Sequence, residues 1–153
     1  MSILEPLLNP DAVSCRLEAG SRKRVLQHIA AQMATPTLHQ DHIFDQLLAR
    51  ERLGSTALGE GVAIPHCRLD TDTMRIAVIT TQEPVDFEAA DGERVDIFFV
   101  LIVPEDERQA HLRALAELSA TLSIEAHRKS LRQCTTQEDL FATMKTMLAA
   151  AAA

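Results

Sequence analysis

The sequence predicts an α/β fold in which a mixed β-sheet is sandwiched between helices on both faces. Residues 97–103 are continuously apolar, which is typical of a central strand covered on both sides. Segments with apolar residues at helical spacing precede and follow this run. The 153 residues have the usual size of one domain and can bury roughly 70% of their unfolded surface, so we expect a single domain over residues 1–153.

Two helices are expected before the first strands. The first spans about residues 22–34, with Ser21 as its N-cap and Pro36 beyond its end. The second is expected to open at Asp41 and to end near Arg52, which places its last residues beside the segment that follows. Its apolar residues share one face: Ile43, Phe44, Leu47 and Leu48.

A tight hairpin is expected next. Residues 55–58 and 62–64 are short β-prone runs, and Gly59 and Gly61 lie between them, where a turn needs positive φ or a close backbone approach. Pro65 contributes no N–H group to a sheet, so the second strand should stop there.

Two longer strands are expected in the middle of the chain, at residues 74–81 and 95–103. The residues between them are rich in Pro, Gly and acidic side chains. We expect turns at 81–84 and 90–93 around a short strand at 85–87.

A long helix should follow Pro104, which ends the central strand. Asp106 is a good N-cap with Gln109 three residues later, and the helix is expected to reach about Ser123. Four leucines at helical spacing should form its buried stripe: Leu112, Leu115, Leu118 and Leu122.

The chain is expected to finish with two helices. A short one lies near residues 126–133, and a last one opens at Thr135, with Glu138 three residues on. Residues 149–153 are alanines without a packing face, and we expect them to fray.

Composition excludes several function classes. A net charge of −7 and the absence of Trp and Tyr argue against a nucleic-acid partner and suit a basic protein partner. Cys15, Cys67 and Cys134 show neither paired nor CxxC spacing, so no disulfide framework or zinc ribbon is expected. The N-terminus lacks a basic signal-peptide region and no apolar run is long enough for a membrane span, so we expect a cytoplasmic protein without membrane insertion.

The residues around Pro65 carry the chemistry. His66 follows the proline directly, so we expect its imidazole to be exposed at a strand edge. A histidine near its reference pKa of about 6.5 supplies an unprotonated nucleophile at neutral pH. Arg50, sixteen residues upstream, offers a fork of donors suited to phosphate oxygens, and Ser55 and Thr56 add hydroxyl and backbone donors.

The same segment resembles the motif of the phosphotransferase-system enzyme IIA domains of the fructose/mannitol/nitrogen-regulatory type. Its parts are, in order, Glu51, six residues, Leu58-Gly59, two residues, Val62-Ala63-Ile64-Pro65-His66 and the small residue Cys67. The resemblance covers the chain from Arg16 to about Leu148. Residues 50–56 and the free-standing chain resemble the nitrogen-regulatory branch more than the sugar permeases. The resemblance implies the fold of the mannitol IIA domain.

The resemblance also implies roles for individual residues. His66 matches the histidine that carries the phosphoryl group, Arg50 the arginine that supports it, and His111 a second histidine beside it. Ser55 and Thr56 would contribute to phosphate binding. Glu51 either orients Arg50 or caps the backbone locally. No cofactor and no metal are expected.

By this resemblance the protein is a phosphotransferase-system component with a phosphohistidine intermediate. A histidine phosphocarrier protein, similar to HPr or NPr, would donate the phosphoryl group to His66. Phosphorylation would then regulate partners, with potassium-transport and sensor-kinase proteins among the family's targets. The alternative is a sugar-specific IIA component of a fructose/mannitol-type permease.

Structural interpretations compete with these roles. Arg50 suits the end of a helix, where cations are favoured, and His111 could be an ordinary solvent-facing helical histidine. Cys67 stands where many relatives have glycine and is read as a small-residue substitution without a redox role. His39 and His42 have H-x-x-H spacing but no further ligand nearby; a metal hydrolase that also used His66 and His111 would bind zinc, which is not expected.

Overall fold

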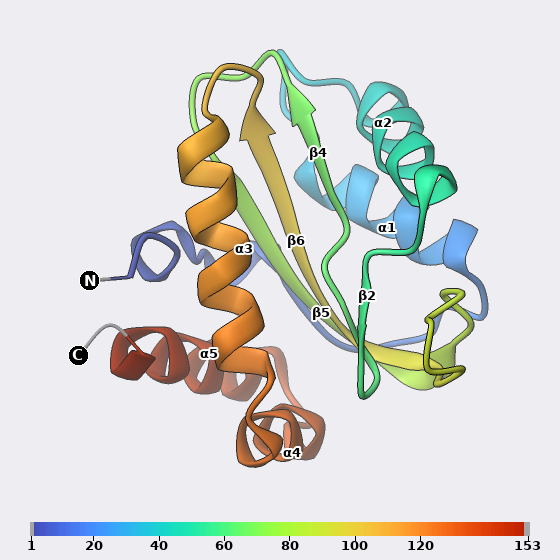
Figure 1. The fold of residues 1–153 in the computed structure, drawn as a ribbon, viewed down its shortest axis with the longest axis vertical. Coiled ribbons are helices and arrows are strands. Elements are labelled where there is room, and N and C mark those ends of the chain that lie inside the picture. Colours follow the sequence, from blue (N-terminus) through green and yellow to red (C-terminus); the bar gives the residue numbers. More distant parts are fainter. Residues whose placement is uncertain (1, 152–153) are drawn as a thin grey trace.

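A six-stranded mixed sheet forms the middle of the molecule in the computed structural model, which describes residues 2–151 (Figure 1). The strand order is β1 (Val13–Leu17), β5 (Arg75–Val85), β6 (Val95–Pro104), β3 (Val62–Ala63) and β2 (Ala57–Gly59), and β4 (His66–Leu69) also pairs with β6. One pair of helices packs on one face of the sheet and three helices pack on the other. The predicted fold class is confirmed.

Strand β6 is the central strand, as its apolar run predicts. It pairs antiparallel with β5 and parallel with both β3 and β4. Along β6 the side chains alternate between two cores: Phe99 and Leu101 face one, and Phe98 and Val100 face the other. Both cores are closed by helices, which explains why β6 has no polar face.

Helices α1 (Arg22–Met33) and α2 (Gln40–Leu53) cover the second of these cores. Ser21 is the N-cap of α1, as predicted, because its side chain accepts a hydrogen bond from the Arg24 N–H group. In α2 the expected start at Asp41 is one residue late: His39 is the N-cap, and its Nδ1 accepts from the Asp41 N–H group at 3.1 Å.

Helices α3 (Arg108–Leu122), α4 (Glu125–Gln133) and α5 (Gln137–Ala151) cover the first core. The predicted capping box at Asp106 is wrong, because the N-cap residue is Glu107 and it makes no side-chain capping bond. Leu112, predicted in the buried stripe, is 67% exposed. Leu118 and Leu122 of the predicted stripe are buried, and Leu115 packs against the core. The inner face of α3 also includes His111, Ala114 and Thr121.

The start of α5 also differs from the prediction. Thr136 rather than Thr135 bonds to the first turn, through Oγ1 to the Asp139 N–H group at 3.1 Å. Residues 149–151 continue the helix, and the last two predicted fraying residues, 152 and 153, lie outside the described residues. No helix within residues 2–151 combines the length and apolar character that a membrane crossing requires.

Strands β1 and β4 and the 3-10 turns η1 (Glu5–Leu7) and η2 (Pro10–Ala12) were not predicted. The predicted break at residues 81–84 is also wrong, because β5 continues to Val85 with an irregular register beyond Thr80. The turn at 90–93 is present and includes Gly92 at φ 76°.

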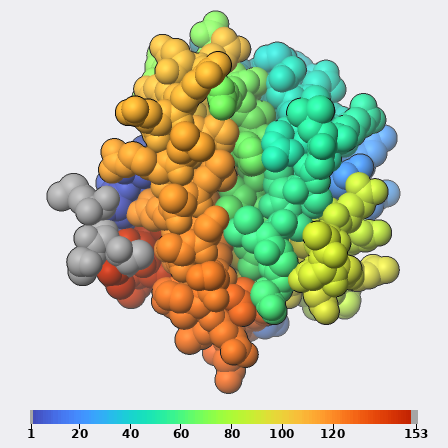
Figure 2. Space-filling view, viewed as in Figure 1, coloured from blue at the N-terminus to red at the C-terminus, as the bar shows by residue number. Residues whose placement is uncertain are grey.

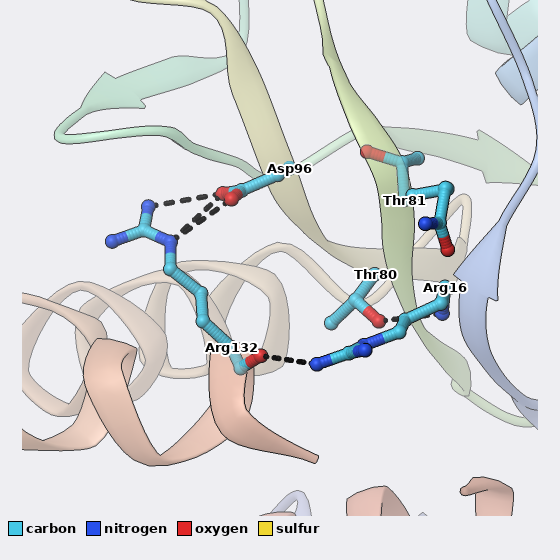
Figure 3. Close-up of a pocket in the computed structure, with 6 residues that line it drawn as sticks. Arg16, Thr80, Thr81, Asp96 and Arg132 are labelled. Carbon is cyan, nitrogen blue, oxygen red and sulfur yellow. Dashed lines mark hydrogen bonds and ion pairs between the residues drawn. The ribbon is translucent and has the colours of Figure 1, made fainter. Parts of the chain in front are cut away.

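The β2–β3 hairpin forms as predicted, and Arg132 of α4 lies against its turn. Arg132 donates from Nε to the Asp96 carboxylate at 3.0 Å (Figure 3) and from Nη2 to the Glu60 carbonyl at 2.6 Å. Arg16 in turn donates to the Arg132 carbonyl at 3.4 Å. Gly61, at φ 78°, lies directly against the Arg132 guanidinium, where a side chain would not fit. The turn of the hairpin is therefore fixed.

Candidate functional site

His66 is the first residue of β4, which runs between α2 and α3 in Figure 1. Pro65 interrupts the strand that precedes it, as predicted, but pairing with β6 resumes at once, with His66 opposite Leu101. The side chain is half-buried rather than exposed at a free edge, which corrects the expectation.

The two ring nitrogens of His66 have different surroundings. Nδ1 lies 2.8 Å from the Ile64 carbonyl oxygen. A carbonyl only accepts, so Nδ1 carries the proton and Nε2 presents a lone pair. The backbone turn at Pro65 places the Ile64 carbonyl beside Nδ1 of His66, and this contact selects the tautomer with the proton on Nδ1.

Two arginines and two histidines line one cavity of about 440 Å³: Arg50, Arg68, His66 and His111. They come from α2, β4 and α3, and the wall is completed by four other residues: Gln46, Ala49, Leu53 and Cys67. Figure 2 shows α3 in orange and α2 in blue-green on this face of the molecule, with a strip of green chain between them. The structure therefore brings together three residues that are far apart in the sequence and that the sequence singled out.

His111 lies in the first turn of α3 and points inward. Its side chain is buried, so the solvent-facing interpretation is wrong. The His66 and His111 rings meet edge to face, with centroids 5.0 Å apart and an interplanar angle of 64°. Nδ1 of His111 accepts a long hydrogen bond of 3.4 Å from Nε of Arg68, which leaves the proton on Nε2. Nε2 is buried and has no partner among residues 2–151.

Both imidazoles are held neutral. Burial lowers the pKa of His66, with Arg50 and Arg68 acting in the same direction, while the Ile64 hydrogen bond opposes them. Burial is also the main reason that the pKa of His111 is lowered to about 4, and the neighbouring His66, Arg68 and Arg50 lower it further. At neutral pH the site holds two uncharged rings beside two guanidinium groups.

Arg50 is in the last turn of α2 and donates from Nη1 to the Gly54 carbonyl at 2.7 Å. No carboxylate within residues 2–151 lies within 4 Å of Arg50 or Arg68. Arg68 is the functional candidate that the sequence reasoning missed. The available signal was its place two residues after His66 in an extended segment, because alternate residues of a strand share a face.

Glu51, Ser55 and Thr56 do not line the cavity. The Thr56 N–H group and hydroxyl both donate to the buried Glu51 carboxylate, so Glu51 caps the backbone locally. Burial raises the pKa of Glu51, and the bonds from Thr56 oppose this shift. The Ser55 hydroxyl donates to the Phe87 carbonyl and accepts from the Ala57 N–H group. These groups fix the α2–β2 connection and are not directed at His66.

The remaining candidates have structural surroundings. Cys67 lines the cavity but is buried and packs into the core under α1 and α2, and burial raises the pKa of its thiol to about 12, which makes it a poor nucleophile. His39 is an N-cap, and no cluster of three or more metal-ligating side chains occurs in the part of the chain that the structure describes. The arrangement around His66 suits an oxyanion: a nucleophilic nitrogen, two cations and a buried N–H donor.

Comparison with known proteins identifies the family. Residues 6–147 match the family model described as "Phosphoenolpyruvate-dependent sugar phosphotransferase system, EIIA 2". The chain belongs to this family. Among EIIA 2 relatives, a nitrogen regulatory protein of Pseudomonas aeruginosa is 44% identical over 141 residues, which cover 90% of this chain and 92% of that protein.

Solved structures give the same result. The nitrogen regulatory protein IIA-Ntr from Neisseria meningitidis superimposes with a TM-score of 0.88 at 36% identity, over 94% of this chain and 99% of that one. The IIA mannitol structure from Escherichia coli has a TM-score of 0.72 at 17% identity, over 90% of this chain and 98% of that one. The second likeness shows the fold, and the first agrees with the nitrogen-regulatory character of the relative above.

Proposed function

We propose that this EIIA 2 protein accepts a phosphoryl group on Nε2 of His66 from a histidine phosphocarrier protein, and that its phosphorylation state regulates partner proteins. The observation that carries the proposal is the hydrogen bond from Nδ1 of His66 to the Ile64 carbonyl. It leaves Nε2 with a free lone pair in a cavity that also holds Arg50, Arg68 and His111.

The transfer replaces one phosphorus–nitrogen bond by another. The Nε2 lone pair of His66 attacks phosphorus while the bond from phosphorus to the donor histidine breaks, and the donor nitrogen recovers its electron pair. The proton on Nδ1 does not move. The positive charge that the ring gains is stabilised by the Ile64 carbonyl dipole, so the ring need not lose a proton during transfer.

The charges of the transferred group determine the roles of the other residues. Three oxygens carry negative charge in the transition state, and catalysis consists mainly of positioning and neutralising them. Arg50 and Arg68 supply two guanidinium groups without carboxylate partners within residues 2–151. Nε2–H of His111 is a buried donor without a partner, and a phosphoryl oxygen would satisfy it.

Regulation follows from the position of the site on the surface. Leu53 and Leu112, which are 86% and 67% exposed, lie on α2 and α3, the helices that contribute Arg50 and His111. A phosphoryl group adds about two negative charges between them, which repels acidic partners and weakens apolar contacts. The nitrogen regulatory relatives support a regulatory output over the sugar-permease alternative. Potassium-transport and sensor-kinase proteins are the candidate targets that the family suggests.

A transfer assay tests the proposal. The protein is incubated with a purified phosphocarrier, the carrier's phosphoryl-donating enzyme and labelled phosphoenolpyruvate, and we expect acid-labile, base-stable label on the chain. His66→Ala should take up no label while keeping a folded circular dichroism spectrum. His42→Ala is the matched control, because His42 is an exposed histidine of α2 that does not line the cavity, and it should be labelled like the wild type. Label on His66→Ala at the wild-type rate would refute the assignment.

A further inference from the structure

A second cavity, of about 330 Å³, lies between the β2–β3 hairpin and the C-terminal half of α3. It shares no lining residue with the cavity around His66. On the helix side its wall is formed by Ser119, Leu122 and Ser123, which are 8 to 12 positions beyond His111, or roughly 12–18 Å along the axis of α3. The cavity is therefore separate from the candidate phosphoryl-transfer site but built on the same helix.

Arg128 of α4 forms the polar part of the wall. It is one of the few charged side chains in the core, with only 8% of its surface exposed. Within residues 2–151 its side chain makes one hydrogen bond, from Nη1 to the Leu122 carbonyl at 2.9 Å, where it caps the end of α3. No carboxylate within the described range 2–151 lies within 4 Å of it.

A buried guanidinium in this state has unused capacity. It carries five N–H donors, and the Leu122 carbonyl accepts from one nitrogen only. A carboxylate or phosphate that binds through two oxygens would pair with donors that the Leu122 carbonyl leaves free. Capping the C-terminus of α3 accounts for the one bond to the Leu122 carbonyl and leaves the other N–H donors of Arg128 without a role.

The other walls are mainly apolar. Val62 is buried, Leu122 is buried, and Leu58 is 49% exposed at the hairpin side. Glu60 is the one acidic residue that lines the cavity; its side chain is exposed, so solvent screens its charge. A volume of about 330 Å³ is at the lower end of the range for small-molecule sites.

We propose that this cavity binds a small organic anion, with a carboxylate or phosphate group on Arg128 and a short apolar tail against Leu58, Val62 and Leu122. The ligand would contact the hairpin near Arg132, which lies one turn beyond Arg128 on α4 and donates to the Glu60 carbonyl of the same hairpin. The inference does not depend on phosphorylation of His66, because Arg128 and the apolar walls belong to a separate cavity.

An NMR titration tests this site. Amide spectra are recorded at pH 7 and constant ionic strength while hexanoate, hexyl phosphate or uncharged hexanol is added. We expect saturable shifts at Gly59, Gly61, Ser119 and Ser123 with both anions, and binding of hexanol at least about tenfold weaker, because it lacks the charge-assisted bonds to Arg128. Equal binding of hexanol, or shifts confined to residues around His66, would overturn the proposal.

Substitutions locate the anion. Arg128→Met should abolish the preference for anions over hexanol. Because loss of the α3 cap could unfold this variant, Leu58→Glu is the second test: Leu58 is half exposed, and a carboxylate there should weaken both anions at least about tenfold by repulsion. Leu112→Glu adds the same charge at an exposed leucine of α3 outside the cavity and should bind as the wild type does. Unchanged affinity in Leu58→Glu would contradict the assignment.

Discussion

At the residue scale, one hydrogen bond decides which ring nitrogen of His66 can attack phosphorus. Nδ1 of His66 is occupied by the Ile64 carbonyl two residues earlier, at 2.8 Å. This bond fixes the ring orientation and the tautomer together, so the protein need not reorganise when the phosphoryl group arrives. The sequence could not reveal this choice, because it depends on the turn that Pro65 imposes on the backbone.

Arg50 is predicted to act through the geometry of its guanidinium group. Arg50→Lys keeps the charge but loses the bidentate fork, so we expect phosphoryl transfer to His66 to slow by about ten- to a hundredfold, or roughly 1.4 to 2.7 kcal/mol of transition-state stabilisation. Rapid-quench measurement with a saturating phosphocarrier gives the rate. Arg68→Lys is the matched variant on β4. A wild-type rate in Arg50→Lys would mean that Arg50 has only a structural role, through its bond with the Gly54 carbonyl.

His111 is predicted to report phosphorylation through its own titration. Its pKa is lowered to about 4 by burial and by the neighbouring positive groups. A phosphoryl dianion on His66, whose ring centroid is 5.0 Å away, favours the protonated form, so the pKa of His111 should rise on phosphorylation. NMR titration of the ring protons in both states measures the change. An identical titration curve in the two states would show that His111 does not contact the phosphoryl group.

At the element scale, the β2–β3 hairpin depends on Gly61. Gly61→Ala requires φ 78° in a residue with a side chain and places Cβ against the Arg132 guanidinium and 3.1 Å from Oδ1 of Asp96. Gly92→Ala is the control, because Gly92 has a similar φ of 76° but no atom within 4 Å of the added Cβ.

Urea unfolding separates these two contributions. We expect Gly92→Ala to lower the free energy of unfolding by about 1 kcal/mol, the cost of the left-handed conformation, and Gly61→Ala to lower it by about 3 kcal/mol. Equal losses in the two variants would mean that the contact between Gly61 and Arg132 contributes nothing to the stability of the hairpin.

The elements also show which local signals are reliable. The Ser21 cap and the Gly59–Gly61 turn were predicted because their side-chain and backbone requirements are local. The cap at Asp106 failed because the chain enters α3 one residue later, at Glu107, without any side-chain bond. Leu112 fits the periodicity of a buried stripe, but the sheet lies on the side of α3 that carries His111 and Leu118.

At the scale of the whole molecule, the layer order followed from β6 alone, because an uninterrupted apolar strand needs cover on both faces. Strand β4 could not be predicted, since its four residues include His66 and Arg68 and it pairs only through contacts distant in sequence. For the same reason Arg68 was missed. Ser55 and Thr56 were assigned to phosphate because hydroxyls near a nucleophile suggest it, but backbone and carboxylate partners occupy them.

The lowered histidine pKa values should make the fold sensitive to acid. A group whose pKa is lower in the folded than in the unfolded state contributes stability that is present above its unfolded pKa and is lost as pH falls. For His111 that window runs from about 6.5 down to about 4. We expect the free energy of unfolding to fall between pH 7 and pH 5, and His111→Gln to lose less over this interval than the wild type. Equal losses, measured by urea unfolding, would contradict the burial of a neutral His111.

The position of the phosphorus atom on the His66 ring tests the central claim most directly. The chain is labelled with ¹⁵N-histidine, phosphorylated by its carrier, and studied by NMR for coupling between ³¹P and each ring nitrogen. We predict coupling to Nε2 of His66, with Nδ1 still protonated and bonded to the Ile64 carbonyl. Coupling to Nδ1, or to a nitrogen of any other histidine, would contradict the mechanism.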